Sequence, residues 1–212
     1  MMKINFRKLV LSVVLVSVVS AVFAQNKADA LKLYNDGKYK EAITVCEDEI
    51  AVNPNNMNSW VVLCWALVAN RQYAEAERRS TEARRINNYD LRVIEVQAES
   101  KYYIGKYNEA LVLFQRYVAT VQENGNNRLG RAYYFMGEIY IKQEKYHHAD
   151  ISLTTAVHIE ELRDLWWGRL GYAREKSGDW KNAIAAYDKA LQLNPYQQIA
   201  VDGKARCKTH VQ

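Results

Sequence analysis

The sequence predicts an all-α protein of about five consecutive helix-turn-helix units followed by a C-terminal capping helix. One phrase, an aromatic residue followed three positions later by alanine, recurs five times, with its alanines at 42, 76, 110, 149 and 183, spaced 34, 34, 39 and 34 residues apart. A polar or glycine-containing turn precedes each phrase, and helical apolar spacing extends over about 14 residues on either side. Such a period indicates a stack of similar two-helix units.

The spacing divides residues 25–197 into five units, which we number one to five. They are 25–56, 57–90, 91–124, 130–163 and 164–197. Residues 123–127 lengthen the connection before unit four. The last stretch, 198–212, has few apolar residues, and we expect it to form a helix that covers the final apolar face.

Small residues recur where the two helices of each unit must approach each other. The second helices carry the five alanines of the phrase, and the first helices carry Ala30, Cys64, Ala98, Gly137 and Gly171. Because a larger side chain at such a site overpacks the interface, the pattern indicates tight pairing of helices.

This pattern resembles the tetratricopeptide repeat (TPR), a helix-turn-helix unit of 34 residues. The resemblance covers nearly all of the chain after residue 24. It implies a right-handed superhelix, a concave face lined by the first helices, and a role in binding other proteins without catalysis.

The N-terminus has the pattern of a secretory signal peptide, with cleavage expected after Ala24. Lys3, Arg7 and Lys8 precede an apolar run from Leu9 to Phe23. An uncleaved membrane anchor is the alternative. The whole chain has 29 basic and 24 acidic residues and a net charge of +5. Removing the three basic residues of the signal leaves 26 against 24, a net charge of +2. We therefore expect no nucleic-acid partner.

No catalytic or cofactor motif is recognisable. The nine glycines form no phosphate-binding loop, and there is no HExxH or CxxC motif. His147 and His148 are adjacent, so on a helix they point in different directions. We expect no metal, no cofactor and no enzyme activity.

The three cysteines leave two interpretations open. Cys46 and Cys64 fall on helices that should be neighbours, so they form either a disulfide, which export would permit, or two small buried apolar residues. Cys207 lies in the capping helix.

Carried onto this chain, the resemblance places a set of aromatic and charged residues on the concave face. The candidate groove residues are Tyr34, Trp65, Arg92, Glu95, Glu99, Tyr102, Arg131, Tyr134, Glu138, Lys142 and Tyr172. Aromatic side chains of this kind anchor partners at a low entropy cost. The alternative is that the charges pair with one another across neighbouring units and that the tyrosines pack on the N-terminal segment or on one another.

The functional expectation is a protein-interaction adaptor of the bacterial cell envelope, exported to the periplasm, that binds a protein or peptide partner in this groove. Two alternatives remain open at this point. One is a structural subunit of an outer-membrane or transporter assembly complex, which would associate with a membrane complex. The other is a carrier of a small hydrophobic ligand.

Overall fold

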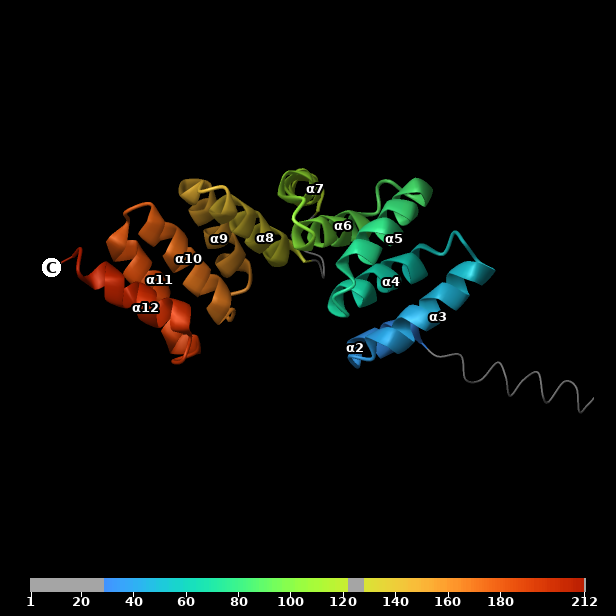
Figure 1. Cartoon of the computed structure of the whole chain (residues 1–212), viewed down its shortest axis with the longest axis horizontal. Coiled ribbons are helices and arrows are strands. Elements are labelled where there is room, and N and C mark those ends of the chain that lie inside the picture. Colours follow the sequence, from blue (N-terminus) through green and yellow to red (C-terminus); the bar gives the residue numbers. More distant parts are fainter. Residues whose placement is uncertain (1–28, 122–127, 212) are drawn as a thin grey trace, which may run out of the picture.

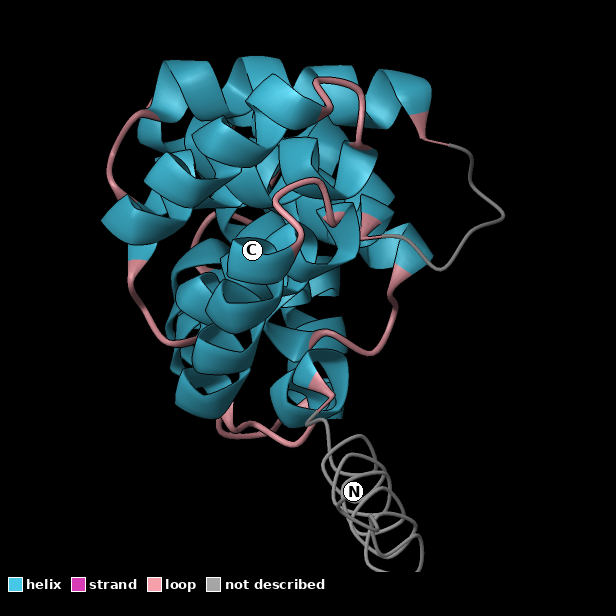
Figure 2. Cartoon of the chain, turned by 90° about the vertical axis from the view of Figure 1, so that its right-hand side faces the viewer, coloured by secondary structure: helices cyan, strands magenta, loops and turns pink. Residues whose placement is uncertain are grey.

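The computed structural model describes residues 29–121 and 128–211. Within these ranges the chain forms eleven α-helices and no strand, which confirms the predicted fold class (Figure 1). Figure 2 shows helices joined by short loops throughout the described residues. The predicted signal peptide at 1–24 and the long connection at 123–127 lie outside the described residues.

The helices occur in pairs, two to each numbered unit, and each helix packs against the next one along the chain. The pairs are α2 (Ala30–Asn35) with α3 (Tyr39–Val52), α4 (Met57–Ala69) with α5 (Tyr73–Ile86), α6 (Leu91–Tyr103) with α7 (Tyr107–Thr120), α8 (Leu129–Lys142) with α9 (Tyr146–Ile159), and α10 (Asp164–Lys176) with α11 (Trp180–Leu193). The last helix is α12 (Gln198–Lys208), which packs on α11 and α10.

The turn between the two helices of a unit has the same backbone conformation in all five units. One residue of each turn has a positive φ: Gly37, Arg71, Gly105, Glu144 and Gly178, at φ 77°, 60°, 82°, 58° and 80°. The amide after it donates to a carbonyl five residues back, as from Lys38 to Leu33 at 2.9 Å and from Asp179 to Arg174 at 2.9 Å. This bond ends the first helix in a Schellman-type motif.

The small residues allow the two helices of a unit to pack closely, with side chains of one helix directly against the other. Ala42, Ala76, Ala110, Ala149 and Ala183 are all fully buried. A methyl group added to Gly137 would meet the Leu153 side chain, and one added to Gly171 or Gly203 would meet the ring of Tyr187. The ring of Tyr187, on α11, therefore lies between α10 and the capping helix α12, and it packs against both.

The five turns provide a test of backbone strain. Arg71 and Glu144 are exposed residues in the left-handed region, which L side chains disfavour and glycine adopts freely. We expect Arg71→Gly and Glu144→Gly each to raise the free energy of unfolding by about 0.5–1 kcal/mol. Urea denaturation measures the change.

Gly178→Ala is the matched control, because nothing lies within 4 Å of the added methyl group and only the backbone conformation opposes it. This substitution should lower stability by a similar amount. Equal stability of all three variants and the wild type would contradict the assignment of strain.

Candidate functional site

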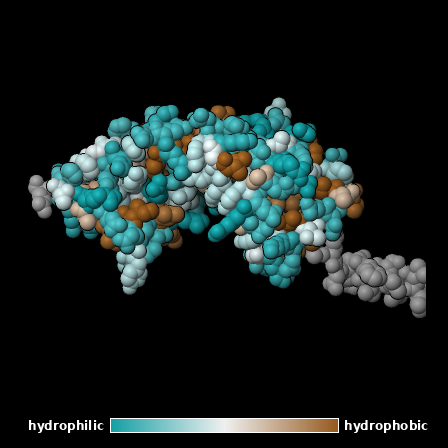
Figure 3. Space-filling view, viewed as in Figure 1, coloured by the Kyte–Doolittle hydropathy of each residue, from teal (hydrophilic) through white to brown (hydrophobic). Residues whose placement is uncertain are grey.

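The arched stack leaves a hollow on one side of the molecule. In the space-filling view the lower side is hollowed between the two ends (Figure 3). The first helices of neighbouring units contact each other along the array, from α2 and α4 through to α10 and α12. Residues on these helices therefore form a continuous surface.

Two adjoining cavities lie on the first helices of units one to three, and we call them together the N-terminal groove. The first has a volume of about 510 Å³ and is lined by residues that include Asn58, Val61 and Val62. The second has a volume of about 530 Å³. It is lined by Leu31, Tyr34, Asn35, Trp65, Leu91, Arg92, Glu95, Tyr117, Val121 and Arg128. Leu31, Trp65 and Arg92 line both cavities.

Arg128, directly before α8, connects unit four with each of the first three units. Its Nη2 donates to the Tyr34 hydroxyl at 3.0 Å, and its guanidinium lies 4.7 Å from the centre of the Trp65 ring. Its Nη1 lies 3.4 Å from Glu95 Oε2 and 3.7 Å from Glu99 Oε2. This one side chain thus contacts residues of α2, α4 and α6.

Two buried polar atoms of the groove have no hydrogen-bond partner. They are Oε1 of Glu95 and the indole Nε1 of Trp65. Glu95 is 1% exposed. Burial raises the pKa of its carboxyl to about 7; Arg128 acts in the opposite direction, and the neighbouring Glu99 raises it further. An unpaired buried group of this kind costs free energy unless a ligand satisfies it.

Glutamates and arginines pair between successive first helices along the rest of the concave surface. Glu99 of α6 binds Arg131 of α8, and Glu138 of α8 accepts from Arg169 of α10 at 2.5 Å. In the last step Glu175 of α10 accepts two hydrogen bonds from Arg206 of α12, at 2.6 and 2.9 Å. Glu99 and Glu138 lie beneath these arginines at 0% and 8% exposure.

Glu175 differs from Glu95 because its partners are close. Its Oε2 also accepts from the Tyr187 hydroxyl at 2.5 Å. Burial acts to raise the pKa of Glu175, but the hydrogen bonds from Arg206 and Tyr187 outweigh it, and the pKa lies below its usual value. Three short bonds stabilise this carboxylate, whereas the shortest contact between Glu95 and an arginine is 3.4 Å.

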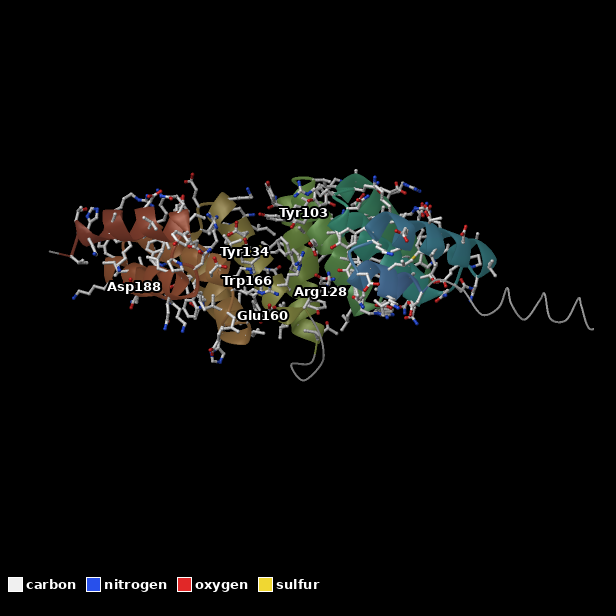
Figure 4. The ribbon with its side chains drawn as sticks, turned by 90° about the horizontal axis from the view of Figure 1, so that it is seen from below. Tyr103, Arg128, Tyr134, Glu160, Trp166 and Asp188 are labelled. Carbon is white, nitrogen blue, oxygen red and sulfur yellow. The ribbon has the colours of Figure 1, made fainter. Side chains whose placement is uncertain are left out.

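The tyrosines predicted for the groove pack on other aromatic rings. Tyr34 lies 5.9 Å from Trp65, Tyr102 lies 4.9 Å from Phe135, and Tyr134 stacks on Trp166 at 5.0 Å. A further cavity of about 390 Å³ lies beside this stack and is lined by residues that include Tyr103, Arg131 and Glu160. Figure 4, seen from the hollow side, shows Tyr103, Arg128, Tyr134, Glu160 and Trp166 near the middle of the molecule.

The remaining candidates are more exposed. Arg92 bonds Asp90 at 2.7 Å and Asn58 at 2.9 Å. Lys142 is exposed, with its ammonium 5.2 Å from the Tyr107 ring. Tyr172 is partly buried beneath Arg169 at 5.1 Å and Lys176 at 5.5 Å. Of the predicted set, the N-terminal groove therefore brings together Tyr34, Trp65, Arg92 and Glu95, which is 4 of 11 residues.

Sequence reasoning missed Arg128, Arg169 and Arg206. A spacing of 31 or 32 residues links each glutamate to its arginine, from 99 to 131, 138 to 169 and 175 to 206, and this regularity is visible in the sequence. Arg128 follows the long connection before unit four, where the 34-residue register is interrupted.

Cys46 and Cys64 form no disulfide: both are free, fully buried thiols, and so is Cys207. Of the two interpretations of these cysteines, packing as small apolar residues describes them in this structure. Among the described residues, no group of three or more His, Cys, Asp or Glu side chains could hold a metal ion. No helix within 29–121 or 128–211 is both long and apolar enough to cross a bilayer.

The comparisons with known proteins agree with this architecture. The tetratricopeptide-repeat family matches residues 130–161 and 165–197. The family described as anaphase-promoting complex, cyclosome, subunit 3 matches residues 35–117. The chain is a tetratricopeptide-repeat protein. Among curated proteins, anaphase-promoting complex subunit 3 of Schizosaccharomyces pombe is 21% identical to this TPR chain over 162 residues. The match covers 76% of this chain but only 24% of that protein.

Solved TPR structures share the fold at low sequence identity. PilF of Pseudomonas aeruginosa superposes with a TM-score of 0.73 at 13% identity, covering 86% of this chain and 81% of that one. MamA of Desulfovibrio magneticus RS-1, from residue 41 to its end, has a TM-score of 0.66 at 18% identity, covering 80% and 93%. YrrB, described as a TPR protein with an unusual peptide-binding site, has a TM-score of 0.66 at 13% identity, covering 88% and 97%.

Glu95 makes stability depend on pH in a direction opposite to that of a salt-bridged carboxylate. Its pKa is 4.5 in the reference state and about 7 in the folded chain. Between these values the folded chain holds a proton that the unfolded chain has lost, so stability falls as pH rises from about 4.5 through 7. Glu95→Gln should remove this fall, which is on the order of 2 kcal/mol between pH 5 and pH 8.

Urea denaturation at pH 5 and at pH 8 measures this change in the free energy of unfolding. Glu175→Gln is the control. Because the pKa of Glu175 is lowered, its contribution is present above about 4.5 and is lost only as pH falls through the folded pKa. The loss from Glu175→Gln should therefore be constant from pH 5 to pH 8. Parallel profiles of the wild type and Glu95→Gln would contradict the assignment.

Proposed function

We propose that this chain is an exported, non-catalytic adaptor of the bacterial cell envelope that holds a segment of a partner protein in the N-terminal groove. The observation that carries the proposal is the pair of adjoining cavities on the first helices of units one to three. Their walls combine apolar, aromatic and hydrogen-bonding groups, a mixture that suits a peptide segment with both apolar and polar side chains.

The alternatives predicted from the sequence are less well supported by the groove. A small hydrophobic ligand requires a predominantly apolar pocket, whereas Arg92, Glu95 and Arg128 are charged groups on the wall of this one. The peptide-binding site attributed to YrrB belongs to that protein, but it supports the proposal because that chain has the same fold. Membership of a membrane-associated assembly remains compatible with an adaptor role.

Leu31→Glu tests the groove. Leu31 is 45% exposed and lines both cavities, so the added charge should block binding without unfolding α2. Peptides selected by the wild-type chain from a displayed random library should bind Leu31→Glu at least about tenfold more weakly, as measured by fluorescence anisotropy.

Val112→Glu is the matched control, because Val112 is 63% exposed on α7 and lines neither cavity of the N-terminal groove. It should leave the affinity unchanged. Failure to select any peptide, or equal affinity for Leu31→Glu and the wild type, would overturn the proposal.

The export part of the proposal has its own test. When the full chain is produced in a bacterium, the mature protein should begin at Gln25 and appear in the periplasmic fraction. Ala24→Trp should block cleavage and leave the uncleaved chain with the membrane, because signal peptidase requires a small residue at that position. Intact mass spectrometry distinguishes the two forms. An uncleaved wild-type chain in the cytoplasmic fraction would contradict export.

A further inference from the structure

The second cavity of the N-terminal groove contains an unusual combination of unpaired groups. Glu95 Oε1 is a buried acceptor without a donor, and Trp65 Nε1 is a buried donor without an acceptor. Both residues line the same cavity of about 530 Å³. Leaving two such groups unpaired is costly, and in a native structure each one calls for an explanation.

We propose that this cavity recognises the carboxamide of an asparagine or glutamine side chain in the bound segment. The proposal rests on the proposed function and names the chemistry of the partner. A carboxamide carries a carbonyl oxygen, which accepts from the Trp65 indole, and an NH₂ group, which donates to Glu95 Oε1. One neutral group thus has both the donor and the acceptor that these two atoms lack.

Charged groups fit the cavity less well. The place of a cation is taken, because the Arg128 guanidinium lies over the Trp65 ring and 3.4 Å from the other oxygen of Glu95. A lysine or arginine of the partner would be repelled by it and would leave the indole N–H unpaired. A carboxylate of the partner would accept from the indole N–H, but its second oxygen would face the Glu95 carboxylate, and the two like charges would repel each other.

The walls suit a side chain with an apolar stem. The aliphatic side chains of Leu31, Leu91 and Val121 line the cavity together with the rings of Tyr34 and Tyr117. These groups would pack on the methylene groups of glutamine while its amide reaches Glu95 Oε1 and Trp65 Nε1.

The guanidinium of Arg128 controls access to the two atoms. Both are covered in the free chain, and Arg128, whose side chain is 29% exposed, lies against both residues that carry them. Arg128 is also bonded to the Tyr34 hydroxyl, which lines the cavity, and lies 3.7 Å from Glu99, which does not line it. A shift of this side chain toward Glu99 would uncover the two atoms and would break its bond to the Tyr34 hydroxyl.

A double-mutant cycle with the whole chain tests the inference. A peptide selected from the displayed library is compared with a copy in which its glutamine is replaced by methionine, which has a similar shape and no amide. With the wild-type chain the replacement should weaken binding about tenfold. With Trp65→Phe, which retains a ring and removes the N–H, the two peptides should differ by less than about threefold.

At pH 8, where the Glu95 carboxyl with its pKa of about 7 is mostly ionised, Glu95→Gln should reduce the difference in the same way, because the charge-assisted hydrogen bond is lost. Trp180→Phe makes the same change on α11, which carries no residue of the groove, and should keep the tenfold difference.

Selection of peptides with lysine, arginine or an acid at the anchor position would overturn the inference. So would an equal effect of the replacement in Trp65→Phe and the wild type. Peptides that are sensitive to Leu31→Glu but need no amide would overturn this inference alone, whereas absence of any binding peptide would overturn the proposed function as well.

Discussion

The close approach of the two helices in each unit is the constraint on which the rest of the structure depends. Fully buried alanines at 42, 76, 110, 149 and 183 leave room for the opposing helix, and glycines at 137 and 171 lie directly under Leu153 and Tyr187. The left-handed residue in every turn then reverses the chain at the same point of each unit. Because both features recur in register, successive units adopt nearly the same geometry and stack into a curved array with a hollow side.

The hollow side combines two kinds of electrostatic environment. From unit three onward, Glu99, Glu138 and Glu175 are each paired with an arginine, which lies on α8, α10 and the capping helix α12 respectively. These ion pairs connect neighbouring helices along the array, and the charges of the glutamates are balanced by arginines of the same chain. Glu95 is the exception, since it is buried as deeply but has one oxygen unpaired. This part of the surface is therefore where a ligand would satisfy groups that the chain itself leaves unpaired.

The fold was predictable from the sequence because packing in this protein is periodic. The alanine phrase marks every second helix, and a residue such as Ala110 has one suitable environment, a tight helix contact. The site was only partly predictable. Glu99 has the register of a groove residue, but whether it faces solvent depends on Arg131, which lies 32 positions later on another helix. Arg128 follows an interruption of the register, so no pattern in the sequence places it beside Tyr34, Trp65 and Glu95.

The bond between Arg128 and Tyr34 joins residues 94 positions apart, from unit four to unit one. In an array of stacked repeats, each unit is stabilised by its immediate neighbours, and the end units open first. Here the short helix α2 packs on α3 and α4, and Tyr34 at its end also accepts a hydrogen bond from Arg128, directly before α8. Fraying of the N-terminal end would therefore break a contact at the start of α8, in the middle of the array. Opening of the curved array between units one and four would separate Arg128 from Tyr34, Trp65 and Glu95 together.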